Sequence, residues 1–104
     1  MTRQESIDKI SESLKTIPDI ESWLFGSSAR GDYHAGSDID LLILLPDHLS
    51  VEQRIKREFE IHGLLMPILI ESGFDISPII LQHKVWNTRN TAFTMNVIND
   101  RIKL

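Results

Sequence analysis

The spacing of apolar residues divides the chain into helical and extended segments. Between residues 7 and 17, isoleucine and leucine recur every three or four positions, which predicts one apolar face of a helix that ends at Pro18. Residues 20–25 are β-branched and aromatic and run directly into Gly26, as expected of a short strand that ends in a turn. The chain therefore begins with a helix followed by a strand.

The strongest strand signal lies in residues 38–45. The segment begins Asp-Ile-Asp and continues with five consecutive apolar residues. This pattern predicts a central strand that is buried on both faces and ends at Pro46. Residues 27–36, which are small and polar, predict a loop with room for one helical turn.

A capping box at Ser50 and Gln53 starts the next predicted helix. Its apolar stripe contains Ile55 and Phe59, and we expect Phe59 in the hydrophobic core. Pro67 leaves two alternatives open, a kinked helix or a shorter helix followed by an extended piece, because proline removes a helical hydrogen bond.

Residues 74–81 predict a third strand, and Pro78 within it favours a position near the edge of the sheet. The tail from residue 83 onward is expected to be helical in part, with its aromatic residues either in the core or at an interface. At 104 residues, the chain fits a single domain spanning residues 1–104.

Composition narrows the class of protein. The chain is 41% hydrophobic and 25% charged, as in ordinary globular proteins, and neither a membrane span nor a signal peptide is expected, which indicates a cytoplasmic protein. A formal net charge of −4 disfavours a nucleic-acid polymer as partner. Because the chain has no cysteine, any metal must be held by carboxylate oxygens or imidazoles.

Two carboxylates carry the chemistry that the sequence suggests. Asp38 and Asp40 occupy positions i and i+2 of the predicted central strand, so they project from the same face. Such pairs suit Mg²⁺, which takes oxygen ligands and leaves positions for substrate phosphates. Gly26 and Ser27 add backbone N–H groups and a hydroxyl that can bind phosphate, and Arg30 adds positive charge. We therefore expect a metal and triphosphate site here.

Other loop motifs fit these residues poorly. A Walker phosphate loop needs Lys followed by Ser or Thr, where this chain has Asp32 and Tyr33. A Gly-x-Ser-x-Gly nucleophile elbow fails as well, because Arg30 replaces its last glycine.

Residues 23–31 (WLFGSSARG) and 36–43 (GSDIDLLI) together resemble the signature of the minimal nucleotidyltransferases in the DNA polymerase β superfamily. That signature is a hydrophobic residue, Gly-Ser, a gap of about ten residues and then acid-hydrophobic-acid; here Asp38 follows Ser27 by 11 positions. The resemblance implies an α/β (α+β) fold like the polymerase palm, with a small mixed β-sheet and helices packed on one side.

The resemblance also assigns roles to individual residues. It makes Asp38 and Asp40 the first two catalytic metal ligands for Mg²⁺, with two ions expected and Mn²⁺ as an alternative. The residues expected to bind the nucleotide phosphates are Gly26, Ser27, Arg30 and Ser37.

The family's third carboxylate has two candidate positions in this chain. Asp75 and Ser77 lie on the same face of the predicted third strand. With Asp75 in that position, the third catalytic metal ligand is present; with Ser77, the site binds nucleotide but catalyses poorly. We favour Asp75.

By this resemblance, the protein is a Mg²⁺-dependent nucleotidyltransferase that moves AMP from ATP, or another nucleoside triphosphate, onto a tyrosine of a HEPN-type helical partner and so acts as an antitoxin. One alternative is a catalytically weak antitoxin that neutralises its partner by forming a complex. A further alternative is transfer to a small-molecule hydroxyl, for which a homo-oligomer would have to complete the acceptor pocket.

Overall fold

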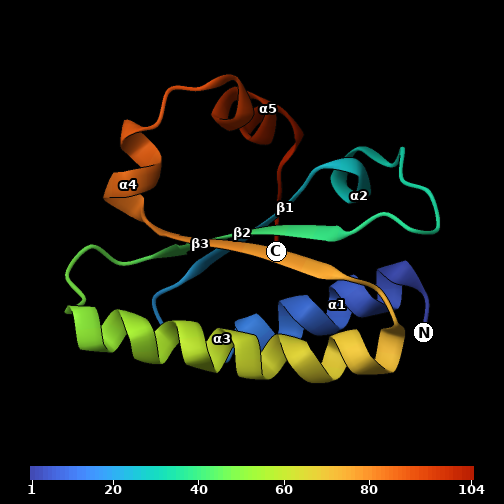
Figure 1. The fold of residues 1–104 in the computed structure, drawn as a ribbon, viewed down its shortest axis with the longest axis horizontal. Helices are drawn as coiled ribbons and strands as arrows, with labels where there is room; N and C mark the ends of the chain where they lie inside the picture. The colour runs from blue at the N-terminus through green and yellow to red at the C-terminus, as the bar shows by residue number, and fades with distance from the viewer.

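The computed structural model describes residues 1–104 as a four-stranded sheet between layers of helices (Figure 1). The strand order is β3-β2-β1-β4. In chain order the elements are α1 (Arg3–Leu14), β1 (Glu21–Phe25), α2 (Ser27–Arg30), β2 (Ile39–Leu45), α3 (Val51–Ser72), β3 (Ile76–Gln82), α4 (His83–Thr88), α5 (Ala92–Asp100) and β4 (Ile102–Lys103).

Strand β2 is the centre of the sheet, as its apolar run predicted. It pairs antiparallel with β1 and parallel with β3, and the long helix α3 makes the crossover between the two parallel strands. Strand β3 is an edge strand, in agreement with the position of Pro78. The short strand β4 brings the end of the chain back beside β1.

The two faces of the sheet build two hydrophobic clusters because successive side chains of β2 point to opposite faces. Toward α1 and α3, the alternate residues of β2 are Ile39, Leu41, Ile43 and Leu45. On the other face, the smaller cluster consists of Phe25, Leu42, Leu44, Trp86 and Val97. The mixed α/β class is confirmed, but α4 and α5 form a second helical layer where we had expected helices on one side only (Figure 1).

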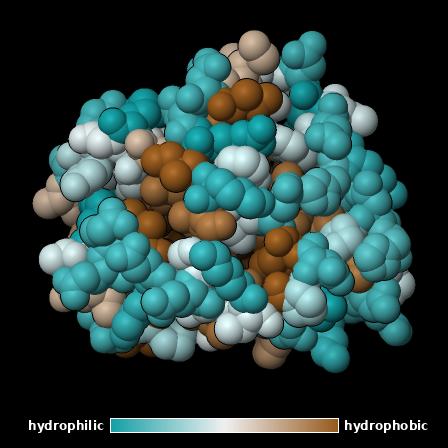
Figure 2. All heavy atoms as spheres, turned by 180° about the vertical axis from the view of Figure 1, so that it is seen from behind, coloured by the Kyte–Doolittle hydropathy of each residue, from teal (hydrophilic) through white to brown (hydrophobic).

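The surface mixes hydrophilic and hydrophobic areas. On the face seen from behind, hydrophobic side chains gather in patches between hydrophilic ones (Figure 2). None of the helices has both the length and the apolar character needed to cross a membrane.

Helix α3 continues through Pro67 without a break and ends at Ser72, which selects the helical alternative. The capping box is present at its start, where Ser50 and Gln53 exchange hydrogen bonds of 3.2 and 2.8 Å. Leu65 and Ile68 are buried on either side of the proline, so both halves of the helix are anchored on the sheet. This packing offsets the hydrogen bond that proline cannot donate.

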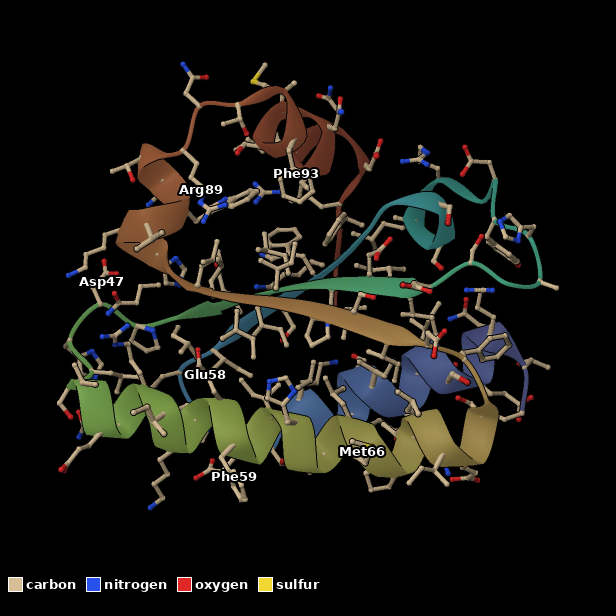
Figure 3. All side chains as sticks on the ribbon, in the orientation of Figure 1. Asp47, Glu58, Phe59, Met66, Arg89 and Phe93 are labelled. Carbon is tan, nitrogen blue, oxygen red and sulfur yellow. The ribbon has the colours of Figure 1, made fainter.

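The prediction that Phe59 lies in the core is wrong, because its side chain is 81% exposed. The core-facing side of α3 is set by Ile61, Leu65 and Ile68. Phe59 precedes Ile61 by two residues, which turns it by roughly 200° around the helix. Figure 3 shows Phe59 pointing away from the sheet.

Candidate functional site

The predicted carboxylate pair lies where β2 begins. Asp40 is paired with Phe25, the last residue of β1, and with Ser77 in β3. Asp38 precedes the strand by one residue and lies near enough to influence the charge state of Asp40. Ser77 pairs with Asp40 in the sheet and donates to Asp38 Oδ2, so both aspartates lie near Ser77.

Gly26 brings the end of β1 directly against the Asp40 carboxylate. A Cβ built on Gly26 would lie 2.5 Å from Asp40 Oδ2, closer than any real side chain allows. The backbone at Gly26 has φ 72° and ψ −155°, a conformation that only glycine adopts readily. Two independent constraints, the positive φ and the carboxylate, therefore require glycine before Ser27.

The one-turn helix α2 follows at once and begins with Ser27. The amides of Ala29 and Arg30 donate to the Gly26 carbonyl at 3.1 and 3.0 Å. The earlier amides of such a turn have no acceptor within the helix, and the Ser27 hydroxyl makes no hydrogen bond in the structure. These groups can donate to the oxygens of a phosphate.

The Asp40 carboxylate accepts no hydrogen bond. Burial and, second, the charge of Asp38 raise its pKa above the ordinary value, while Arg30 acts in the opposite direction. This is a half-buried carboxylate whose charge is poorly compensated by the protein itself. A bound cation would supply the compensation.

Of the two candidates for the position of the third carboxylate, the structure places Ser77, and not Asp75, beside Asp38 and Asp40. Ser77 lies opposite Asp40 in the parallel pairing, and its hydroxyl donates to Asp38 Oδ2 at 2.8 Å. Asp75 lies before β3 with an exposed side chain, and its carbonyl accepts from the Ile39 amide at 2.8 Å. No three acidic or imidazole side chains converge on one point. The proposed role of Asp75 as third ligand gains no support from this geometry.

The other predicted phosphate ligands already have partners. Arg30 forms ion pairs with Asp32 at 3.1 Å and with Asp100 of α5 at 2.6 Å, and these hydrogen bonds raise its pKa. The Ser37 hydroxyl accepts from the His34 amide at 3.0 Å and so shapes the turn before Asp38. For either residue to bind phosphate, these local contacts would have to be exchanged.

Arg3 is the site residue that the sequence did not reveal. It is buried to 7% exposure at the start of α1. Its guanidinium donates to the Ser28 hydroxyl and to the carbonyls of Ser37 and His34 at 2.9–3.1 Å, and it lies 4.5 Å from the Tyr33 ring centre. Arg3 therefore ties the loop before Asp38 to α1 and α2. Nothing in its local sequence distinguishes it from a surface arginine.

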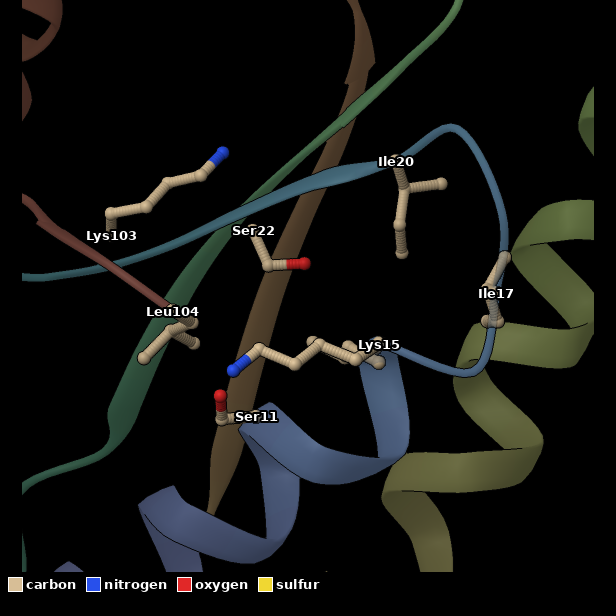
Figure 4. A pocket seen from close by; sticks show the side chains of 8 residues that line it. Ser11, Lys15, Ile17, Ile20, Ser22, Lys103 and Leu104 are labelled. Atoms are coloured by element: carbon tan, nitrogen blue, oxygen red, sulfur yellow. The ribbon is translucent and has the colours of Figure 1, made fainter.

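None of the cavities contains Asp38 or Asp40 in its lining. The cavity in Figure 4, of about 170 Å³, lies between α1, β1 and β4 and is lined in part by Lys15, Ser22 and Lys103. The carboxylates thus lie outside these cavities, where β2 begins, with the Asp38 side chain exposed and that of Asp40 half-buried.

The donor set fits a magnesium ion that keeps part of its coordination shell for substrate. Two carboxylates supply hard oxygen donors, and the lone pairs of Asp40 are free of hydrogen bonds. Magnesium is commonly held by one or two carboxylates with water and substrate phosphates completing the octahedron. Asp38 and Asp40 would be the residues that hold such an ion.

The contact between Gly26 and Asp40 can be tested with a second glycine of the same loop. Gly31 also has a positive φ, 86°, but a Cβ there meets nothing within 4 Å. Gly31→Ala should cost on the order of 1 kcal/mol of unfolding free energy through backbone strain. Gly26→Ala should cost at least about 2–3 kcal/mol, because its methyl group also collides with the carboxylate. Urea denaturation measures both, and equal losses would contradict the role given to Asp40.

The raised pKa of Asp40 predicts a pH-dependent stability. Between the pKa of the unfolded chain, about 3.9, and the higher folded pKa, the folded state binds more protons, so stability falls as pH rises. Asp40→Asn should therefore unfold at a higher temperature than wild type at neutral pH without divalent cations. The difference should vanish in acid below the unfolded pKa. Thermal unfolding across this range is the measurement, with exposed Asp75→Asn as control; a less stable Asp40→Asn at neutral pH would refute it.

Comparison with known proteins identifies the family and the fold of this chain. The model of the nucleotidyltransferase domain family matches residues 7–87. A chain in a crystal structure of a toxin-antitoxin with AMP-PNP has 21% identity, with coverage of 98% of this chain and 72% of the other and a TM-score of 0.57. A Sulfolobus solfataricus protein assigned to the nucleotidyltransferases has 20% identity, coverage of 96% and 82% and a TM-score of 0.54.

A third structure with this fold contains tri-AMPylated Shewanella oneidensis HEPN toxin in complex with MNT antitoxin; its matching chain has 20% identity, coverage of 98% and 71% and a TM-score of 0.53. A comparison with curated protein sequences finds no match. At these identities the solved structures show a shared fold, while the family model spans most of the chain. The chain belongs to the nucleotidyltransferase domain family.

Proposed function

We propose that the protein transfers AMP from ATP to a tyrosine hydroxyl of a HEPN-type helical partner in the cytoplasm and acts as its antitoxin. The observation that carries this proposal is the Asp40 carboxylate held against the Gly26 backbone, with Asp38 beside it, where β2 begins. Family membership supports nucleotidyl transfer in general. The choice of AMP and of a HEPN partner is supported by the similar fold found with AMP-PNP and with an AMPylated HEPN toxin.

In this proposal, each residue of the turn has a binding role. Asp38 and Asp40 would hold Mg²⁺, and the free Ser27 hydroxyl and the early amides of α2 bind the phosphate oxygens. When bound, the ion neutralises charge on those oxygens. Arg30 would leave Asp32 or Asp100 to approach the phosphates.

The reaction is an in-line displacement at the α-phosphorus. The tyrosine oxygen forms a bond to the α-phosphorus, the bond to the bridging oxygen breaks and pyrophosphate leaves. The proton of the tyrosine hydroxyl passes to a carboxylate of the site. Catalysis comes mainly from positioning and from stabilisation of charge, so the rigid start of β2 is the main contribution of the protein.

The position of the label in ATP tests this reaction directly. With Mg²⁺ and the helical partner, ATP labelled at the α-phosphate should transfer label to the partner, whereas ATP labelled at the γ-phosphate should not, because pyrophosphate departs. Asp38→Asn combined with Asp40→Asn should reduce transfer to background. Gel autoradiography is the readout, and label transfer that survives the double substitution would overturn the proposal.

Asp75→Asn is the matched control for this assay, since it makes the same chemical change at an exposed carboxylate. Retained transfer would show that Asp38 and Asp40 suffice. Loss of transfer in a variant with unchanged unfolding temperature would instead restore Asp75 to the role of third ligand.

The contact between Ser77 and Asp38 favours a second candidate function, a nucleotide-binding antitoxin with weak catalysis. A serine in the position of a third carboxylate offers a neutral donor where the two-metal arrangement needs a charged oxygen. Such a protein would neutralise its partner by complex formation. Wild type without label transfer but with Mg²⁺-dependent ATP binding would favour this candidate.

Replacement of Ser77 by aspartate should separate the two candidates. Ser77→Asp places a third carboxylate beside Asp38 and Asp40, so without metal we expect a lower unfolding temperature through repulsion of like charges. Added Mg²⁺ should then raise the unfolding temperature more in Ser77→Asp than in wild type, with Ser77→Ala as the control that adds no charge. An equal Mg²⁺ response in all three proteins would show that position 77 does not face the metal.

A further inference from the structure

The outer side of α3 carries an apolar stripe that no other element covers. Its five large side chains are more than half exposed, from 54% to 81%. The outer stripe consists of Val51, Ile55, Phe59, Met66 and Ile70, with the exposed His62 between them. Steps of 4, 4, 3, 4 and 4 residues place all six on one arc of about 100° around the helix.

The outer stripe is symmetric about its own centre. Each member has a counterpart at the same distance from the midpoint of residues 60 and 61. The pairs are Val51 with Ile70, Ile55 with Met66 and Phe59 with His62. From this symmetry we infer that two copies of the chain associate through antiparallel α3 helices, with a two-fold axis at that midpoint. In such an isologous interface the same patch serves both copies.

Gly63 fits this pairing and has no other evident purpose in packing. Glycine in the middle of a helix lowers helix stability, and a Cβ at Gly63 would meet nothing within 4 Å. In the antiparallel pair, Phe59 of the second copy reaches the level of His62 and Gly63. The most exposed side chain of the stripe thus meets the one position that lacks a side chain, which allows the two helices to approach closely.

Charges along the edges of the stripe do not oppose this arrangement. By the same symmetry, each charged residue lies level with an uncharged residue of the second helix, so no like charges are brought to the same level. The residues that lie level with these charges are Leu69 for Glu52, Pro67 for Arg54, Leu65 for Lys56 and Gly63 for Glu58.

The apolar surface is large enough for a specific dimer. Five such side chains expose on the order of 500 Å² in each copy, so a pair buries about 1,000 Å² or more, near the lower limit of specific interfaces. A cavity of about 200 Å³ adjoins the stripe and is lined by Met66, Leu69 and Pro78 among others. Ile55 of the second copy, opposite Met66, lies at its mouth.

Sedimentation of the whole chain tests the pairing. Wild type should show about twice its 11.9 kDa mass at micromolar concentration. Phe59→Glu should raise the dimer dissociation constant at least about 100-fold. Met95→Glu, the same kind of change at an exposed residue of α5, should leave the dimer unchanged. A monomeric wild type, including one that associates only with a helical partner, would overturn the inference.

Because the chain has no cysteine, introduced thiols can test the antiparallel geometry. Ile55→Cys with Met66→Cys should form a covalent dimer on mild oxidation, since the two positions face each other across the axis. Within one helix they are roughly 16 Å apart and cannot bond. Ile55→Cys alone should remain uncrosslinked, because position 55 of one copy lies roughly 16 Å along the helix from position 55 of the other. Crosslinking of the single variant, or none in the double variant, would exclude this two-fold arrangement.

Discussion

The close approach of the Gly26 backbone to the Asp40 carboxylate is the contact on which the site depends. The antiparallel pairing of β1 and β2 ends at Phe25 and Asp40, so the sheet holds the adjacent Gly26 close to the carboxylate. The absence of a side chain at Gly26 makes room for the carboxylate, and its positive φ turns the chain into α2. Ser27 follows directly as the first residue of α2. A single backbone geometry therefore places both the expected metal ligands and the expected phosphate donors.

This contact requires a rigid support, because a half-buried carboxylate without hydrogen bonds opposes folding. The support comes from the rest of β2, whose apolar side chains are buried on both faces of the sheet. Arg3 adds a second restraint by fastening the loop before Asp38 to α1 and α2. The stability of the two hydrophobic clusters thus offsets the strain and desolvation that are concentrated at one end of the strand.

The sequence was sufficient for features that depend on local chemistry. The alternation at Asp38 and Asp40, the apolar run of β2 and the capping box of α3 are read from neighbouring residues, and the structure agrees with them. The prediction for Phe59 was wrong because contacts with the sheet decide which side of α3 faces the core. Arg3 was missed because its partners lie 25 to 34 residues away. Which of Asp75 and Ser77 lies beside Asp38 and Asp40 likewise depends on the register of β3 against β2, which no local pattern encodes.

The small size of the chain bears on the interpretation of the outer stripe. Only 22 of 104 residues are buried, although 41% of the chain is hydrophobic, so a considerable part of the apolar surface must face outward. Scattered exposure would need no explanation, but on α3 the exposed apolar residues share one arc and one centre of symmetry. The carboxylates lie at the start of β2, whereas the stripe lies on the side of α3 that faces away from the sheet. The carboxylates and the outer stripe therefore lie on different parts of the fold and can be exposed at the same time.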